Sequence, residues 1–337
     1  MRGSLFCLLL ALSVASCDKD CNPVSPSGGS GSSAGVQVWV TPNIGSDVVG
    51  LVAKPDDWKE ARSRIDVLKL YPGQVESGGC VICGNNNLKN FMDVVPGGAF
   101  RWFNNEGIVF ALEAGAVKDW NCGGRMPDEN VESASNAIRN IEMNGGRVRY
   151  LAIDEPFTAI KASCEQSIDT TAGQVKYYIN RLNSMHPRVS IGLIEAYPYL
   201  GAEEIEEMVI SVEKLGVHFP FLHIDGHRHG ALANYDIPGD LRRLRDFSRG
   251  HGMDFGAIIW GDDGGSNQGF TNEAIMTAES IRVAIGSPDH LLIQSWSEIG
   301  NDPFAPNSRI YPDNIPEDKE FTFMWLVNQQ LVRFGIR

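Results

Sequence analysis

Eight short, mainly apolar segments recur along the chain after residue 35, and a stretch of helix-like sequence follows each of them. A parallel strand needs a long crossover before the next strand can pair beside it, so strands that alternate with helices indicate a parallel sheet. Eight such units within roughly 300 residues predict a closed (β/α)8 barrel that folds as a single domain. The predicted strands are Val36–Val40, Ile65–Leu70, Ile108–Leu112, Val148–Ile153, Val189–Ile194, Phe219–Ile224, Phe255–Ile259 and Leu291–Ile293.

The helices between these strands are marked by residues that favour a helix start or stop. The segments Thr170–Met185 and Ala202–Leu215 are predicted helices, and Pro187 follows the first of them. A proline shortly after a helix favours its termination. A last helix near Glu320–Arg333 is expected to cover the barrel wall.

The composition places limits on the partners of the protein. The chain has 337 residues and a formal net charge of −13, with 43% hydrophobic and 21% charged residues. These values are ordinary for a soluble globular protein. Nucleic-acid-binding proteins normally present a basic surface to the phosphate backbone. The acidic balance therefore disfavours nucleic acid as a partner.

The N-terminal segment has the pattern of a secretory signal. Arg2 precedes the apolar segment Leu5–Val14, which is too short to cross a bilayer. This segment ends in Val14-Ala15-Ser16-Cys17, which resembles the cleavage motif of bacterial lipoproteins. The resemblance implies that residues 1–16 are removed and that Cys17 carries a lipid anchor. A plain signal peptide cleaved nearby is the alternative, because small residues precede both kinds of cleavage site.

The segment after the signal predicts how the barrel is attached and where it resides. Residues 17–35 are expected to form a flexible tether, because they are rich in serine and glycine. Residues 36–337 would then form the barrel of an exported protein, held by lipid in the bacterial cell envelope. Disulfides are permitted there and are favoured over a zinc site, with their pairing left open. The cysteines expected in loops on one rim are Cys80, Cys83, Cys122 and Cys164.

Acidic residues follow most of the predicted strands. In a (β/α)8 barrel the C-terminal ends of all strands meet at one mouth, where the active site of such enzymes lies. The sequence therefore predicts a ring of carboxylates around that mouth. Its members are Glu113, Asp154, Glu155, Glu195, Asp225, Asp262, Asp263 and Glu298.

Aromatic residues stand beside these acids and point to carbohydrate chemistry. Hydrolysis of a glycosidic bond needs one carboxyl group to protonate the leaving oxygen and a second to attack the sugar or activate water. Aromatic rings typically supply flat apolar platforms for sugar rings. The aromatic residues near the strand ends are Tyr71, Trp120, Tyr197, Tyr199, Trp260 and Trp296.

Two short motifs carry a resemblance to the (β/α)8 glycoside hydrolases. Asp154-Glu155-Pro156 after the fourth strand resembles the Asn-Glu-Pro motif of the large clan whose acid/base glutamate ends that strand. Trp296-Ser297 after the eighth strand is similar to the Trp-Ser pair of the same clan. The chain departs from the clan after the seventh strand, where Trp260-Gly261-Asp262-Asp263 stands in place of the nucleophilic glutamate.

The resemblance implies a glycosidase that acts on an oligo- or polysaccharide without a cofactor. Glu155 matches the proton donor, and the second carboxylate is expected to be Glu195, Asp262 or Asp225. The remaining residues are expected to contact substrate. They are Lys69, Tyr71, Glu113, Asp154, Tyr197, His227, Trp260, Trp296 and Glu298.

Two other functions stay open from the sequence. Asp225, His227 and His229 alternate along the chain and could share a face while extended, which is compatible with a divalent metal site. Such a site would indicate a metal-dependent sugar isomerase or hydrolase. The missing glutamate after the seventh strand instead favours a carbohydrate-binding barrel without catalysis.

Overall fold

The computed structural model describes residues 35–42, 50–75, 98–117, 127–163, 166–226, 236–261, 265–295 and 312–336. The chain divides into two compact units, Met1–Ala34 and Gly35–Arg337, and every described residue belongs to the second unit. The predicted signal segment and most of the tether therefore lie outside the described residues.

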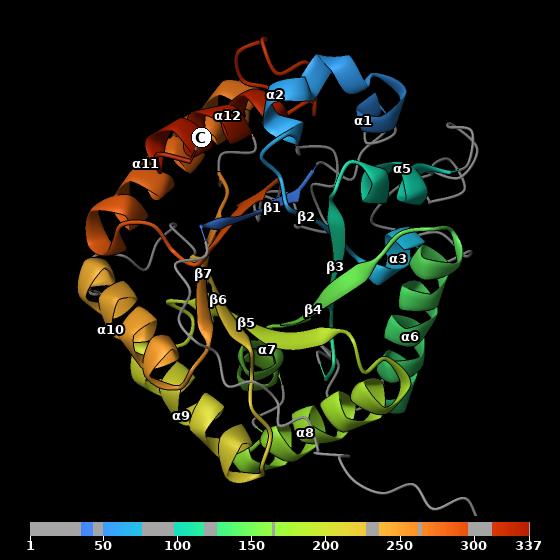
Figure 1. Ribbon diagram of the computed structural model, residues 1–337. Coiled ribbons are helices and arrows are strands. Elements are labelled where there is room, and N and C mark those ends of the chain that lie inside the picture. The colour runs from blue at the N-terminus through green and yellow to red at the C-terminus, as the bar shows by residue number, and fades with distance from the viewer. Residues whose placement is uncertain are drawn as a thin grey trace, which may run out of the picture. The chain divides into compact units, whose positions relative to one another are not determined.

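Eight parallel strands close into a barrel in the order in which they occur along the chain, with β8 paired to β1. Figure 1 looks along this barrel, with the strands inside and helices outside. The predicted (β/α)8 fold is confirmed. The strands are β1 (Gln37–Thr41), β2 (Val67–Leu70), β3 (Val109–Ala114), β4 (Val148–Asp154), β5 (Ser190–Tyr197), β6 (Phe221–Gly226), β7 (Asp254–Ile259) and β8 (His290–Gln294).

Several strands continue beyond the apolar segments that predict them. β3 includes Glu113, β4 ends at Asp154 and β6 includes Asp225, although the apolar segments stop before these acids. The ladders of hydrogen bonds continue because parallel pairing depends on the backbone and tolerates a polar side chain that faces the mouth. These acids are therefore held by the sheet itself.

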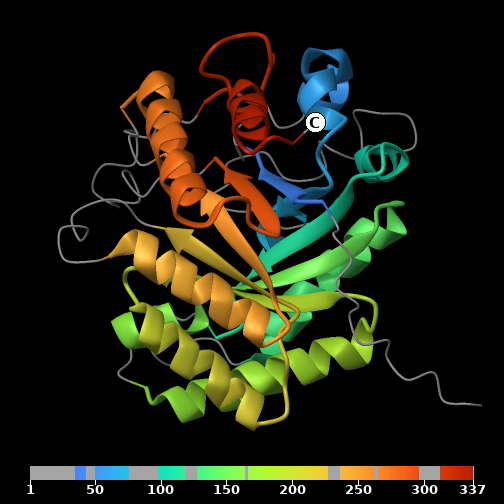
Figure 2. The ribbon, with the colours of Figure 1, turned by 60° about the vertical axis from the view of Figure 1, so that its left-hand side comes forward.

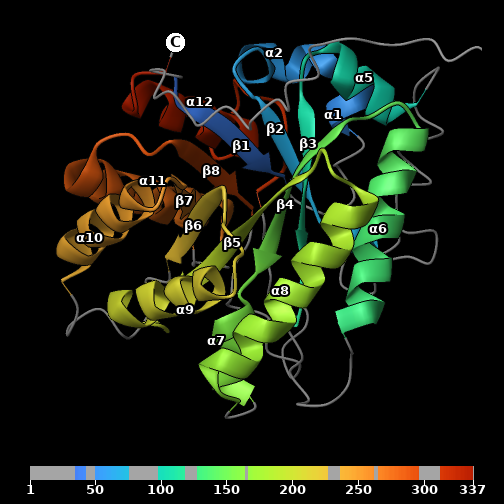
Figure 3. The ribbon, with the colours of Figure 1, turned by 60° about the horizontal axis from the view of Figure 1, so that its bottom comes forward.

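Helices follow the strands and pack outside them. Figure 2 shows α10 and α11 along the outside of the strands, and α6 and α8 lie side by side in Figure 3. Ser167 begins α8 by accepting a hydrogen bond from the backbone N–H of Thr170, a common way to start a helix. The helices are α1 (Gly50–Ala53), η1 (Pro55–Trp58), α2 (Lys59–Arg62), α3 (Pro72–Val75), α5 (Ala99–Asn105), α6 (Pro127–Met143), α7 (Pro156–Ser163), α8 (Ile168–Met185), α9 (Ala202–Lys214), α10 (Ile237–Gly250), α11 (Asn267–Ile285) and α12 (Phe323–Arg333).

The helix α7 is separated from β4 by the single residue Glu155. It lies beyond the end of that strand, at the C-terminal end of the barrel (Figure 3). Among the helices that the structure describes, none combines the length and apolar character needed to cross a membrane.

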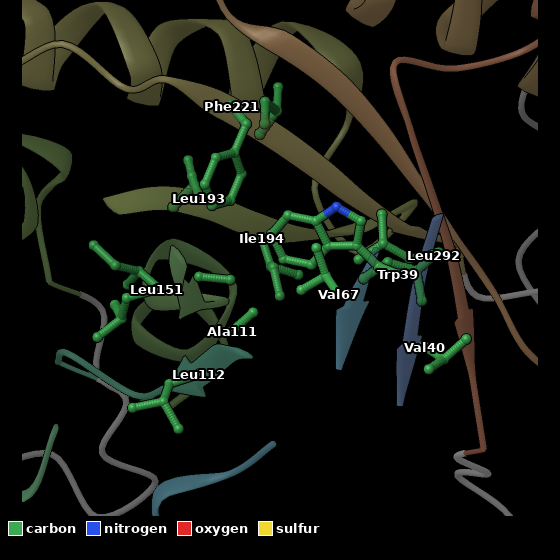
Figure 4. Close-up of a cluster of buried hydrophobic side chains, with 14 of the residues drawn as sticks. Trp39, Val40, Val67, Ala111, Leu112, Leu151, Leu193, Ile194, Phe221 and Leu292 are labelled. Atoms are coloured by element: carbon green, nitrogen blue, oxygen red, sulfur yellow. The ribbon is translucent and has the colours of Figure 1, made fainter. Parts of the chain in front are cut away.

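An aromatic layer fills the interior of the barrel. The ring of Trp39 from β1 packs against Tyr150 of β4, Phe221 and His223 of β6, and His290 of β8. These side chains come from strands that are not all neighbours, so they meet across the barrel and not along its wall. Figure 4 shows Trp39 and Phe221 within this packed interior. We call these five side chains the aromatic floor.

Two glycines make room for the aromatic floor. A Cβ atom at Gly192 would lie 2.4 Å from ring atoms of Phe221, and one at Gly256 would lie 2.3 Å from the ring of His223. Real Cβ atoms do not approach other atoms so closely, so glycine at these two positions is a packing requirement.

Candidate active site

The strand register identifies which side chains enter the barrel. Paired residues of parallel strands share a face, and Trp39 lies in the interior. Following the pairs around the barrel places polar side chains of six strands or strand ends above the floor. We call the following set the mouth cluster: Lys69, Tyr71, Glu113, Asp154, Asp225, Trp260 and Gln294.

Lys69 is the cation of the mouth cluster and is buried. Its Nζ contacts the carboxylate of Glu113 on β3 and donates a hydrogen bond of 2.7 Å to Oε1 of Gln294 on β8. A buried ammonium group is tolerated only when partners replace the water that it loses. Lys69 therefore joins β2, β3 and β8 at the mouth.

The carboxyl group of Glu113 retains a proton far more readily than a carboxyl group in water. Burial raises its pKa to about 7, the charge of Lys69 acts against this rise, and the charges of Asp154 and Asp225 add to it. Three carboxyl groups with one ammonium group would carry excess negative charge if all were ionised. The cluster therefore holds a proton near neutral pH.

Tyr71 adds a neutral hydroxyl to the same cluster. Burial raises its pKa well above the ordinary value, and the charges of Glu113, Asp154 and Asp225 raise it further. A hydrogen bond links the hydroxyl to Glu113. Tyr71 therefore stays protonated and donates to the Glu113 carboxyl group.

Asp225 is held by an aromatic partner. The indole Nε1 of Trp260 donates a hydrogen bond of 2.6 Å to Oδ1 of Asp225, and both side chains are buried. A donor aimed at a carboxylate favours its ionised form. Trp260, which the sequence predicts as a sugar platform, fixes Asp225 through this hydrogen bond.

Glu195 lies on the other face of the sheet. Its neighbour Ala196 pairs with Asp225 and faces the interior, so the Glu195 side chain points outward, where it is fully buried. Its carboxylate accepts hydrogen bonds from the backbone N–H groups of Phe157 and Thr158, at 3.1 and 3.2 Å, and from the Thr158 hydroxyl at 2.8 Å. Glu195 thus binds the first turn of α7 and is not part of the mouth cluster.

Burial raises the pKa of Glu195, whereas the hydrogen bonds that Thr158 and Phe157 donate to both of its oxygens act to lower it. The charge of Glu155 raises this pKa as well, so the two glutamates are electrostatic neighbours. Asp154 and Glu155, although consecutive, therefore act on different groups. Asp154 influences the mouth cluster, and Glu155 influences Glu195.

Glu155 has an unusual backbone conformation. Its φ angle is +43°, a left-handed value that costs a residue with a Cβ atom roughly 1–2 kcal/mol. Its N–H donates to the carbonyl of Ile194 at 3.1 Å, and its carbonyl accepts from Ala159 at 3.0 Å. The turn that contains Glu155 is therefore strained and is held by β5 on one side and α7 on the other.

Tyr197 is also directed away from the mouth. It is buried, and its hydroxyl donates a hydrogen bond of 2.7 Å to Asp240 of α10. The ring therefore ties β5 to an outer helix. It is not placed as a platform for a sugar in the mouth.

Four of the predicted site residues lie outside the described residues, as do the predicted lipid attachment site and the rim cysteines. Among the described residues, no group of three or more His, Cys, Asp or Glu is arranged to hold a metal ion. The site residues outside the described part of the chain are Asp262, His227, Trp296 and Glu298, and the cysteines there include Cys17, Cys80, Cys83, Cys122 and Cys164.

Two residues of the site escape the sequence-based expectations. Gln294 directly follows the predicted eighth strand, and counting alternate residues from Leu292 would have placed it in the interior. Thr158 gives no such signal, because its role depends on the contact between α7 and β5. A pattern within one segment cannot reveal a contact between two segments.

A cavity of about 220 Å³ lies outside the mouth cluster. It is lined mainly by apolar side chains between the sheet and the helices α10 and α11, among them Ile224, Ala257, Leu241 and Ile281. Ile224 and Ala257 alternate with the interior residues of β6 and β7, so this cavity belongs to the outer face of the barrel.

No family model matches the sequence, and no curated protein matches it. Xylanase 10B from Thermotoga maritima has 10% identity over 90% of this chain and 96% of its own, with a TM-score of 0.50.

Two further solved structures have similar values. A D-psicose 3-epimerase, solved in the presence of D-fructose, has 11% identity over 89% of this chain and 99% of its own, with a TM-score of 0.50. A glucosidase from Croceicoccus marinus has 12% identity over 82% of this chain and 63% of its own, with a TM-score of 0.49. At such identities the likeness shows the fold alone. The chain is a (β/α)8 barrel that resembles a xylanase and a D-psicose 3-epimerase in architecture.

Proposed function

We propose that the protein hydrolyses a glycosidic bond with carboxyl groups of the mouth cluster. The observation that carries this proposal is the convergence of Glu113, Asp154 and Asp225, from three different strands, at the C-terminal end of the barrel. Glycoside hydrolysis needs a carboxyl group that donates a proton and a second that attacks or activates water. The cluster supplies both kinds.

In this proposal Glu113 is the proton donor. Its pKa of about 7 leaves the group protonated in a large fraction of molecules near neutral pH. A carboxyl group poised near the working pH is the most effective general acid.

Asp225 is the proposed nucleophile or base. The hydrogen bond from Trp260 favours its anionic form, and its charge already acts on Glu113. Asp154 would then bind a sugar hydroxyl, as would Lys69 and Tyr71. Asp225 is one of the residues that the sequence predicts as the second carboxylate. Glu195, another of them, instead accepts hydrogen bonds from the first turn of α7.

Glu155, the donor expected from the sequence, is the rival to Glu113. Glu155 directly follows Asp154, the last residue of β4, and its charge acts on Glu195. The same experiment can separate these two candidates, because each can be changed to glutamine without altering its size.

The test is hydrolysis of a broad panel of oligosaccharides by the full-length protein and its variants, followed by mass spectrometry of the products. Glu113→Gln and Asp225→Asn should each reduce turnover by at least about 100-fold, since each removes a group used in the transition state. Asp246→Asn, at an exposed position of α10, makes the same charge change and should keep full activity.

Three results would count against this assignment. Absence of hydrolysis by the wild type across the panel would reject the function. Full activity of Glu113→Gln together with an inactive Glu155→Gln would move the donor role to Glu155. Full activity of Asp225→Asn would remove Asp225 from the reaction.

A further inference from the structure

Glu195 connects two features that each bear on the proposed site. Its carboxylate accepts three hydrogen bonds from the first turn of α7, from Phe157 and Thr158. This turn begins directly after Glu155, whose backbone is left-handed. The only residue between the sheet-held Asp154 and the helix-held Pro156 is therefore the strained one.

The strain makes the exit of β4 dependent on its anchors. A left-handed glutamate persists only where the surrounding structure fixes it on both sides. On the strand side, the Glu155 N–H is bound to the carbonyl of Ile194 at 3.1 Å. On the helix side, Glu195 holds the first turn of α7. Both anchors come from adjacent positions of β5.

We propose that Glu195 is a positioning residue that fixes the strained turn after β4 and thereby holds the Asp154 carboxylate in the mouth cluster. We call the hydrogen bonds between Glu195 and the first turn of α7 the clamp. If the clamp is lost, the backbone of Glu155 relaxes to a negative φ angle, and the end of β4 turns with it. Asp154 then moves away from Glu113. This inference rests on the proposed function only for its effect on catalysis, since the displacement itself can be measured without turnover.

Two substitutions weaken the clamp to different degrees. Glu195→Gln replaces one acceptor oxygen by an NH₂ group, which faces donors of α7 and cannot bind them. Thr158→Val removes the hydroxyl donor with little change of volume and leaves both backbone hydrogen bonds in place. Both variants should lower kcat with KM nearly unchanged, by on the order of 10–100-fold for Glu195→Gln and less for Thr158→Val.

A matched control exists elsewhere in the chain. Glu317 binds the first turn of α2 through the backbone N–H groups of Glu60 and Ala61, both at 2.8 Å. Glu317→Gln therefore damages a helix start of the same kind, away from the mouth cluster. It should leave kcat and the pH dependence of activity unchanged.

The readout that needs no substrate is the titration of Glu113, followed by NMR of its ¹³C-labelled carboxyl group. The charge of Asp154 contributes to the pKa of about 7. Displacement of Asp154 should therefore lower the Glu113 midpoint in Glu195→Gln, toward the value found in Asp154→Asn. Glu317→Gln should leave the midpoint where it is.

The outcomes distinguish this inference from the proposed function. If the wild type hydrolyses no sugar but Glu195→Gln still lowers the Glu113 midpoint, the function fails and the positioning role stands. If Glu195→Gln leaves both kcat and the midpoint as they are in Glu317→Gln, the positioning role is overturned. Should Glu195→Gln fail to fold, Thr158→Val decides the question by the same two measurements.

Discussion

At the scale of single residues, the position of a side chain on the strand decides its role. Asp154 and Glu155 are neighbours in the sequence, yet one acts on Glu113 inside the barrel and the other on Glu195 outside it. The sequence motif singles out the pair but not the division between them. The two side chains have different neighbours because successive residues of a strand face opposite sides and because Glu155 has a left-handed backbone. No residue type in the motif predicts this left-handed turn.

The contact between Lys69 and Glu113 makes a prediction at this scale. Lys69→Met should destabilise the protein by about 3–5 kcal/mol, because it leaves a buried carboxyl group beside two other acids without its cation. Lys69→Met combined with Glu113→Gln should recover most of this loss. The measurement is urea unfolding of the wild type and both variants at pH 7, and equal stability of the single and double variants would contradict the coupling.

At the scale of elements, the sequence predicts the strands well and their chemistry less well. All eight apolar segments become strands, because burial on both faces requires continuous apolar sequence. The polar residues at their ends still pair in β3, β4 and β6, so the strands are longer than hydrophobicity alone indicates. The clamp between β5 and α7 could not be predicted, since it joins segments about forty residues apart through one carboxylate.

The two interior glycines give a prediction for the packing of these elements. Gly192→Ala should cost about 1–3 kcal/mol, because its Cβ atom would lie 2.4 Å from the Phe221 ring. Gly173→Ala is the matched control, since Gly173 lies in α8 with no neighbouring atom within 4 Å. It should stabilise the protein by roughly 0.5–1 kcal/mol.

Thermal or urea unfolding of both alanine variants measures the difference. A second variant, Gly192→Ala with Phe221→Leu, should regain part of the lost stability because the smaller side chain yields space. A Gly192→Ala protein as stable as the Gly173→Ala protein would show that the Phe221 ring moves aside without cost.

At the scale of the whole molecule, the barrel has a charged mouth above an aromatic floor that contains two buried histidines. His223 Nε2 and His290 Nδ1 are 2.9 Å apart, and His290 Nε2 lies 3.6 Å from the Asp254 carboxylate. Burial lowers the pKa of His290 to about 4, although Asp289 opposes this, and burial lowers that of His223 well below its ordinary value. Both histidines are neutral at physiological pH.

The histidine pair predicts acid sensitivity of the fold. The unfolded chain binds protons at these histidines below about pH 6.5, whereas folded His290 does so only near pH 4. The contribution of His290 to the free energy of unfolding is therefore fully present above pH 6.5 and is lost as the pH falls toward 4. Relative to His290→Asn, the wild type should lose about 3 kcal/mol across that interval.

Urea unfolding of both proteins at several pH values provides the comparison. The difference between the two curves reports on His290 and on its effect on the pKa of His223. Glu113 and Glu195, whose pKa values are raised, affect both proteins alike and with the opposite sign. Parallel curves between pH 6.5 and 4 would show that protonation of His290 does not limit the fold.

The aromatic floor also closes the interior of the barrel below the mouth cluster. Among the described residues, Trp39, Phe221 and their neighbours pack together and fill the barrel below Lys69. Under the proposed function, substrate would therefore reach the carboxyl groups from the C-terminal end of the barrel, and product would leave by the same end. Each product would then have to leave before the next substrate could bind, so product release could limit the rate of turnover.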